Sequence, residues 1–150
     1  MKSLGPAGNV LLQMFRTGQA VRELLAQAVE GTGITPDEWA VLSSIGYQGR
    51  VSPSELAGGL RVPPTTISRY VAGFVESGLA RRIPNPEDGR SYLLELTDDG
   101  GTVVGTIVPR FLEILDRLRE LTAVEEIETA LLELERAARA VAFDSTATRH

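Results

Sequence analysis

The stretch from residue 52 to residue 78, SPSELAGGLRVPPTTISRYVAGFVESG, predicts two short helices in close succession. The first begins at SPSE (52–55), where serine can cap the helix, proline fits its first turn and glutamate closes a capping box. The second begins at Pro63 or Pro64 and ends at Gly78. Its apolar residues recur at spacings of three and four: Ile67, Val71, Phe74 and Val75. A short helix, a tight turn and a second helix indicate a helix-turn-helix.

The face of the second helix opposite this apolar stripe is polar, and most of its side chains are small. It carries Thr65, Thr66, Ser68 and Arg69. Hydroxyl groups can bond phosphates or base edges, and an arginine can bond guanine in bidentate fashion when such a helix lies in the major groove. The hydroxyls could instead satisfy backbone N–H groups of the first turn, and Arg69 could be solvated surface charge. The place of these residues in the motif favours DNA contact.

A two-stranded hairpin is predicted next, in residues 79–97, LARRIPNPEDGRSYLLELT. Tyr92, Leu94 and Leu96 alternate with Ser91, Leu93 and Glu95, as in a strand, and Asp-Gly at 88–89 supplies turn chemistry at an exposed tip. A hairpin behind a helix-turn-helix forms a wing. Arg90 follows the tip and could enter the narrow minor groove, whose negative potential attracts arginine.

Longer helices flank this region. Residues 9–30 carry apolar side chains at helical spacing, and TPDE (35–38) repeats the capping-box pattern before a helix expected to stop at Gly46. Beyond the hairpin, Thr97 caps a long helix that Pro109 is expected to kink. The sequence therefore predicts a mainly α fold with a two-stranded β wing.

A third capping box, formed by Thr122 and Glu125, is expected to open the last helix. Glu38, Glu55 and Glu125 are thus explained by helix starts rather than by catalysis. The outer helices carry more apolar surface than one small domain can cover, which predicts a homodimer. We expect one compact unit with three segments: an N-terminal dimerisation helix (1–34), a winged helix-turn-helix DNA-binding region (35–97) and C-terminal dimerisation helices (98–150).

Composition excludes many kinds of catalytic site. The 150 residues contain no cysteine and a single histidine, His150. Thiolate chemistry, cysteine zinc sites and thiol oxidation are therefore excluded, and a histidine base is lacking. We expect no enzymatic activity, no metal and no cofactor. The chain has no apolar run near the roughly 20 residues that span a bilayer and no signal-peptide pattern, so we expect a cytoplasmic protein with no membrane partner.

The net charge of −5 at first argues against a nucleic-acid partner, because basic residues supply most of such affinity. The charge is unevenly distributed along the chain, however, because residues 61–90 carry five arginines against three acidic residues. For Arg81 and Arg82, in the first arm of the hairpin, DNA contact and solvated surface are evenly balanced. Arg82 is retained as a candidate wing contact.

The runs ITPDEWAVL (34–42), SELAGGLRVPPTTISRYV (54–71) and ESGLARRIPNPEDGRSYLLELTDDG (76–100) resemble the MarR family of bacterial transcriptional regulators. The resemblance implies a winged-helix dimer with interlocking terminal helices. Such a dimer binds a pseudo-palindromic operator and is often released by a small, frequently aromatic ligand. The positions that match the family's recognition helix are Pro64, Thr65, Thr66, Ser68 and Arg69. At the wing tip, the resemblance implies that Asp88 steadies the turn and Arg90 touches the minor groove.

Two departures from the family pattern predict modest DNA affinity. Pro63 stands where a small N-cap residue is common, and it offers neither a side-chain cap nor a backbone donor. Ala72 and Gly73 replace the acid and the base that often follow the arginine, so a phosphate contact is lost and a helix-weakening glycine is introduced.

An effector pocket is a weaker expectation. Trp39, Met14, Phe15 and Phe111 could line one, although apolar residues at helical spacing are more often core. Arg16 could pair with a ligand carboxylate, although a surface or interface ion pair is favoured. Trp39 and Arg16 are the candidate ligand-binding residues.

These observations favour a ligand-responsive repressor that binds double-stranded DNA as a homodimer and responds to a small aromatic or phenolic effector. The alternative is a winged helix used as a protein-interaction module with little or no DNA binding, which the acidic net charge and Gly73 would suit. An enzyme is the third and least favoured class.

Overall fold

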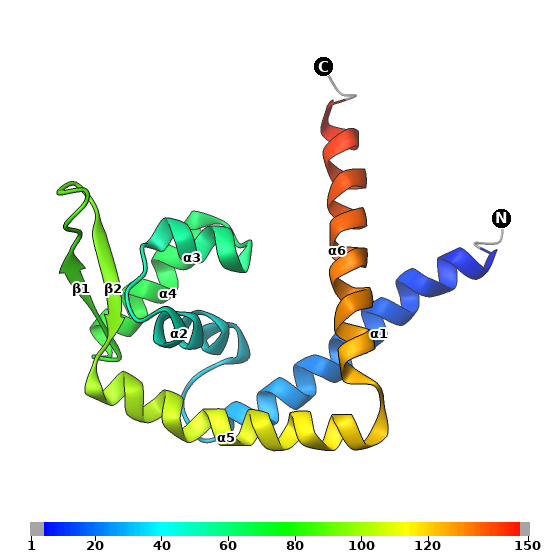
Figure 1. The fold of residues 1–150 in the computed structure, drawn as a ribbon, viewed down its shortest axis with the longest axis horizontal. Helices are drawn as coiled ribbons and strands as arrows, with labels where there is room; N and C mark the ends of the chain where they lie inside the picture. The colour runs from blue at the N-terminus through cyan, green and yellow to red at the C-terminus, as the bar shows by residue number, and fades with distance from the viewer. Residues whose placement is uncertain (1–4, 148–150) are drawn as a thin grey trace. The chain divides into compact units, whose positions relative to one another are not determined.

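The computed structural model describes the backbone of residues 5–147 and the side chains of residues 9–141. Its elements are α1 (Gly5–Val29), α2 (Pro36–Gln48), α3 (Pro53–Leu60), α4 (Pro64–Glu76), β1 (Ala80–Pro84), β2 (Tyr92–Leu96), α5 (Asp98–Leu121) and α6 (Val124–Ala147). Figure 1 shows β1 and β2 as a hairpin beside α2, α3 and α4, with α5 beginning at its base. The predicted mainly α fold with a two-stranded wing is confirmed.

Two of the three predicted capping boxes form. The Thr35 hydroxyl accepts from the Glu38 N–H, and the Glu38 carboxylate accepts from the Thr35 N–H at 2.8 Å. Ser52 and Glu55 make the same pair at the start of α3. These reciprocal bonds explain why both helices begin where the sequence predicts.

The third predicted box, at Thr122, is wrong. Helix α6 begins at Val124, so Ala123 rather than Thr122 immediately precedes the helix. The Glu125 carboxylate instead accepts from Arg119 Nε at 3.0 Å. The pKa of Glu125 is lowered chiefly by the hydrogen bond from its own backbone N–H and further by the hydrogen bond from Arg119.

Helix α2 also extends past its predicted end at Gly46. Its C-terminal residue is Gln48, and Gly49 provides the left-handed backbone with φ of 75°. Gly46 serves packing, because a β-carbon built there would lie 3.0 Å from the Leu96 side chain. The sequence correctly marks two glycines but does not reveal which one ends the helix.

The main hydrophobic core lies between α2, α3, α4 and the hairpin. Its fully buried members include Leu42, Ile45, Leu56, Ile67 and Leu94. The strands pair antiparallel from Ala80 opposite Leu96 to Pro84 opposite Tyr92. An isolated bridge between Val51 and Leu94 joins β2 to the segment before α3. The hairpin is thus attached by backbone bonds to the helix-turn-helix.

Helix α5 leaves the hairpin through a tight junction. The Thr97 hydroxyl accepts from the Gly100 N–H and donates to the Gly78 carbonyl. Gly100 lies against the Leu79 carbonyl so closely that a β-carbon would collide with it. The expected cap at Thr97 is confirmed, and a glycine in the first turn makes the junction possible.

Contacts divide the chain into two units, residues 1–112 and 113–150, with the division inside α5. This differs from the one compact unit expected from length. The functional segments 1–34, 35–97 and 98–150 stay a prediction. Among the helices of residues 5–147, none has the length and apolar character needed to cross a bilayer.

Candidate nucleic-acid interface

Helix α4 turns a polar face to solvent. Ile67, Val71 and Phe74 are buried, whereas Ser68 and Arg69 are exposed on the other side. Pro64 and Thr65 are exposed as well, and Thr66 is half-buried. The periodicity therefore predicts correctly which face the protein covers.

The start of α4 has no side-chain cap. Pro63 occupies the N-cap position. The first turn is held by the backbone, because the Pro63 carbonyl accepts from the Thr66 N–H at 2.9 Å. Within the described part of the chain, the hydroxyls of Thr65, Thr66 and Ser68 make no hydrogen bond to protein. The alternative that these hydroxyls satisfy first-turn N–H groups is therefore not realised.

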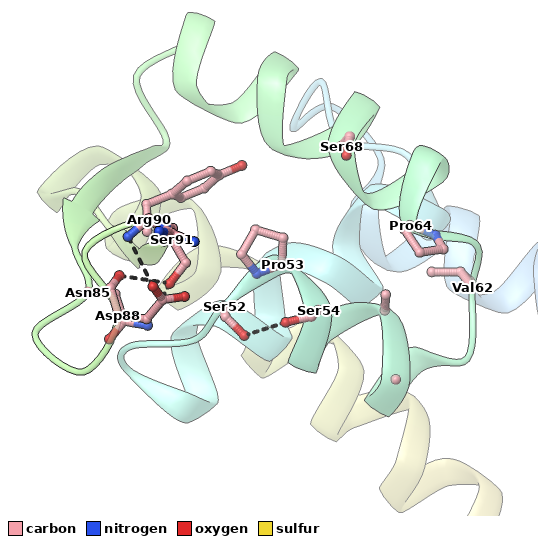
Figure 2. Close-up of a pocket in the computed structure, with 13 residues that line it drawn as sticks. Ser52, Pro53, Ser54, Val62, Pro64, Ser68, Asn85, Asp88, Arg90 and Ser91 are labelled. Carbon is pink, nitrogen blue, oxygen red and sulfur yellow. Dashed lines mark hydrogen bonds between the residues drawn. The ribbon is translucent and has the colours of Figure 1, made fainter.

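An open groove of about 840 Å³ runs between α3, the start of α4 and the hairpin tip. Figure 2 shows Ser52 just before α3, Ser54 from α3, Pro64 and Ser68 from α4, and the hairpin-tip residues around this hollow. Only two of its lining residues are charged: Asp88 and Arg90. Helices α3 and α4 and the hairpin tip thus form one surface, which is mainly apolar by exposed area and poor in charge.

The hairpin tip is held by short-range hydrogen bonds. Asp88 accepts from the Arg90 N–H at 3.0 Å through its side chain and from the Ser91 N–H at 3.0 Å through its carbonyl. Asn85 Nδ2 donates to the Ser91 hydroxyl at 2.8 Å (Figure 2). These bonds fix the backbone on both sides of Arg90 and leave its side chain exposed.

Strand register places Arg81 and Arg82 on opposite faces of the hairpin, a difference that the sequence does not show. Arg82 pairs with Leu94, so its side chain shares the face of β2 that carries Tyr92, and its guanidinium lies 5.0 Å from the Tyr92 ring centroid. Arg81 pairs with Glu95 on the opposite face. Tyr92 lines the groove, so Arg82 lies on the groove side of the hairpin and Arg81 does not.

Glu95 binds two arginines that the sequence does not connect. Its Oε1 accepts from Arg81 Nε at 2.7 Å, and its Oε2 accepts from Arg50 Nε at 3.1 Å. The Glu95 side chain is 16% exposed, while both arginine side chains are above 60%. The hydrogen bond from Arg81, supported by Arg50, lowers the pKa of Glu95 below the ordinary glutamate value.

The candidate ligand-binding residues do not lie together. Trp39 stacks on Phe111 of α5 with ring centroids 5.0 Å apart and an interplanar angle of 11°. Beside this stack, Arg110 Nη1 donates to the Glu30 carbonyl at 2.8 Å and to the Ala28 carbonyl at 3.3 Å, at the end of α1. Arg16 is exposed thirteen residues before that end, about 20 Å along the helix at 1.5 Å per residue.

The described side chains, residues 9–141, contain no group of three or more histidine, cysteine, aspartate or glutamate residues placed to hold a metal ion. Two interactions that the sequence does not indicate, Arg50 with Glu95 and Arg110 with the end of α1, join residues at least 45 positions apart. Strand alternation could have placed Arg81 and Glu95 on one face only if the register were known.

Comparison with known proteins gives one consistent result. The model of the MarR family matches residues 32–91. The multiple antibiotic resistance protein MarR of Salmonella typhimurium is 31% identical over 69% of this chain and 74% of its own length. The transcriptional repressor MdtR of Bacillus subtilis is 27% identical over 61% of this chain and 59% of its own length.

Solved structures share the fold. A mutant MarR from E. coli, crystallised with operator DNA, has a TM-score of 0.74 at 24% identity over 89% of this chain and 94% of that one. At that identity, the likeness concerns the arrangement of helices and hairpin.

Proposed function

Since this chain belongs to the MarR family of transcriptional regulators, we propose that it is a repressor that binds a pseudo-palindromic operator as a homodimer. The observation that carries the proposal is the exposed face of α4 beside the groove, where the hydroxyls of Thr65, Thr66 and Ser68 make no hydrogen bond to the described residues. A buried helix start would need its hydroxyls bonded, whereas a face that meets DNA leaves them available. A relative described as a repressor and a neighbour solved with operator DNA support it.

In this proposal, α4 enters the major groove and the wing reaches the adjacent minor groove. Thr65, Thr66 and Ser68 meet phosphates or base edges, and Arg69 reads a base. Arg90 projects from the fixed hairpin tip toward the minor groove. Two subunits would place their α4 helices about 34 Å apart, one helical turn of DNA.

A binding titration against the duplex upstream of the protein's own gene tests the proposal. Each phosphate that the protein neutralises contributes about −0.9 to the slope of log affinity against log salt. The candidate arginines Arg69, Arg82 and Arg90 neutralise at most one phosphate each, so two subunits predict a slope no steeper than about −5. A scrambled duplex of equal length is the control. Equal affinity for both duplexes, or no salt dependence, would contradict the proposal.

The second candidate function is a winged helix that binds another protein. The net charge of −5 and the charge-poor groove favour it. The same titration distinguishes the two, because a protein-interaction module would bind neither duplex at low salt.

We also propose that a small aromatic or phenolic effector binds near Trp39 and weakens operator binding. Trp39 is the single tryptophan and stacks on Phe111, so its fluorescence reports on this junction. Titration with a series of aromatic acids should change that fluorescence and release DNA at the same concentrations. Arg16→Ala tests the weaker assignment, because an unchanged effector affinity would remove Arg16 from the site.

A further inference from the structure

Glu95 joins three segments of the chain at one carboxylate. Arg81 belongs to β1, Arg50 to the turn between α2 and α3, and Glu95 itself to β2. Each carboxylate oxygen accepts from a different arginine, at 2.7 and 3.1 Å. With its side chain 16% exposed, Glu95 is the shielded member of the group.

The neighbouring backbone reinforces this attachment. Val51 and Leu94 exchange two hydrogen bonds, 3.1 Å from the Val51 N–H and 2.8 Å from the Leu94 N–H. Strand β2 is therefore attached to the helix-turn-helix at two successive residues, once by backbone and once by side chain. From that point the hairpin continues to its tip without another such bridge among the described strands.

We propose that Glu95 is a positioning residue for DNA binding, which sets the direction of the wing relative to α4. The role rests on the proposed function, because it acts through Arg90 at the tip. Arg81 and Arg50 are then anchors of the wing, and Arg82, on the groove side, stays a candidate contact. Glu95 itself does not touch DNA.

Electrostatics and positioning predict opposite effects for the loss of this carboxylate. Removing one negative charge from a DNA-binding region strengthens DNA attraction and frees two arginines. Removing the attachment lets the wing change direction and weakens the contact of Arg90. The sign of the change in affinity therefore decides between a charge effect and a positioning role.

The experiment compares Glu95→Gln with Glu87→Gln, an exposed acidic residue at the hairpin tip that undergoes the same change of charge. We expect Glu87→Gln to bind the operator as well as wild type or better, and Glu95→Gln to bind at least tenfold more weakly. Glu95→Gln that binds as tightly as Glu87→Gln would overturn the role. Wild-type protein without operator preference would instead overturn the proposed function.

A double-mutant cycle separates wing positioning from general loss of structure. In the Glu95→Gln background, Arg90→Ala should cost much less than in wild type, while Arg69→Ala should cost the same in both. If Glu95→Gln does not fold by circular dichroism, Arg50→Gln removes only the tether outside the hairpin and enters the same cycle. Additive behaviour with both arginines would refute wing positioning.

Discussion

Arg69 and Arg90 are both exposed arginines, yet their surroundings predict different parts in DNA binding. Arg69 stands on regular helix beside Tyr70, with its guanidinium 5.0 Å from that ring centroid. Arg90 stands on a turn that Asp88 holds. An arginine on the recognition helix can read a base, whereas one at a wing tip senses the shape and potential of the minor groove.

We therefore expect Arg69→Ala to weaken operator binding by about 1 to 3 kcal/mol with loss of preference at one base pair. Arg90→Ala should weaken binding with less base-specific loss. Arg69→Lys is the matched control, because it keeps the charge and loses the bidentate fork. Competition titrations with single-base operator variants measure both effects, and equal affinity of wild type, Arg69→Ala and Arg90→Ala would exclude these contacts.

Glu95 also predicts a pH dependence of stability. Its pKa is lowered in the folded state, chiefly by the hydrogen bond from Arg81. The ionised group therefore stabilises the fold above the unfolded value of about 4.3, and this contribution is lost as pH falls through the lowered pKa. Urea unfolding should show wild type more stable than Glu95→Gln at pH 7, with the difference shrinking below about pH 4. A difference that grows on acidification would have the wrong sign.

At the level of elements, α4 begins differently from the two helices that precede it. Helices α2 and α3 each begin with a reciprocal capping box, while α4 begins at Pro63 without a side-chain cap. Gly73 adds backbone freedom in its middle. The helix proposed to meet DNA therefore lacks the side-chain cap that both neighbouring helices have.

Gly73→Ala should stabilise the protein by about 1 kcal/mol, the difference in helix propensity between the two residues. A β-carbon at Gly73 meets nothing within 4 Å, so no steric clash opposes the gain in stability. The measurement is chemical denaturation followed by circular dichroism. An unchanged or lower free energy of unfolding would show that α4 is already held by its packing.

Gly100→Ala is the opposite case in another helix. The added methyl group would collide with the Leu79 carbonyl, which also accepts from the Thr97 N–H. Overpacking of this kind costs typically about 1 to 3 kcal/mol, so the same substitution should destabilise here. Because the collision lies at the base of the wing, operator affinity should fall as well. Stability equal to that of Gly73→Ala would contradict the geometry.

For the whole molecule, the main unexplained feature is the apolar surface left exposed. On α1 the exposed large apolar side chains are Val10, Leu11, Leu12, Met14, Phe15 and Val21. In the C-terminal unit they include Leu121, Ile127, Leu131, Leu132 and Val141. Exposed apolar side chains gathered on one helix mark an interaction site, which supports the proposed homodimer.

We expect light scattering at micromolar concentration to give twice the chain mass for wild type. Phe15→Glu places a charge in the α1 surface and should shift the mass toward one chain. Tyr47→Glu is the control, because Tyr47 is 94% exposed but lies on α2, outside this surface. A wild-type monomer, or equal sensitivity of the two variants, would contradict dimerisation through α1.

Local sequence alone determined where most elements begin and which faces they bury. The starts of α2, α3 and α5 follow from capping residues three positions apart, and the buried stripe of α4 follows from its spacing. Such interactions join residues within one helical turn, so they can be inferred without knowing the path of the chain. The MarR-like motifs are also contained within continuous segments.

Only the tertiary structure decided which distant residues meet. It showed that Gly46 packs against Leu96 while Gly49 ends the helix, and that Glu95 binds Arg50 across 45 positions. It also assigned Arg81 and Arg82 to opposite faces of the hairpin. These outcomes depend on strand register and on how helices pack, which local spacing does not specify. The sequence therefore determined helix α4 and the hairpin, and the tertiary structure decided what holds the hairpin beside that helix.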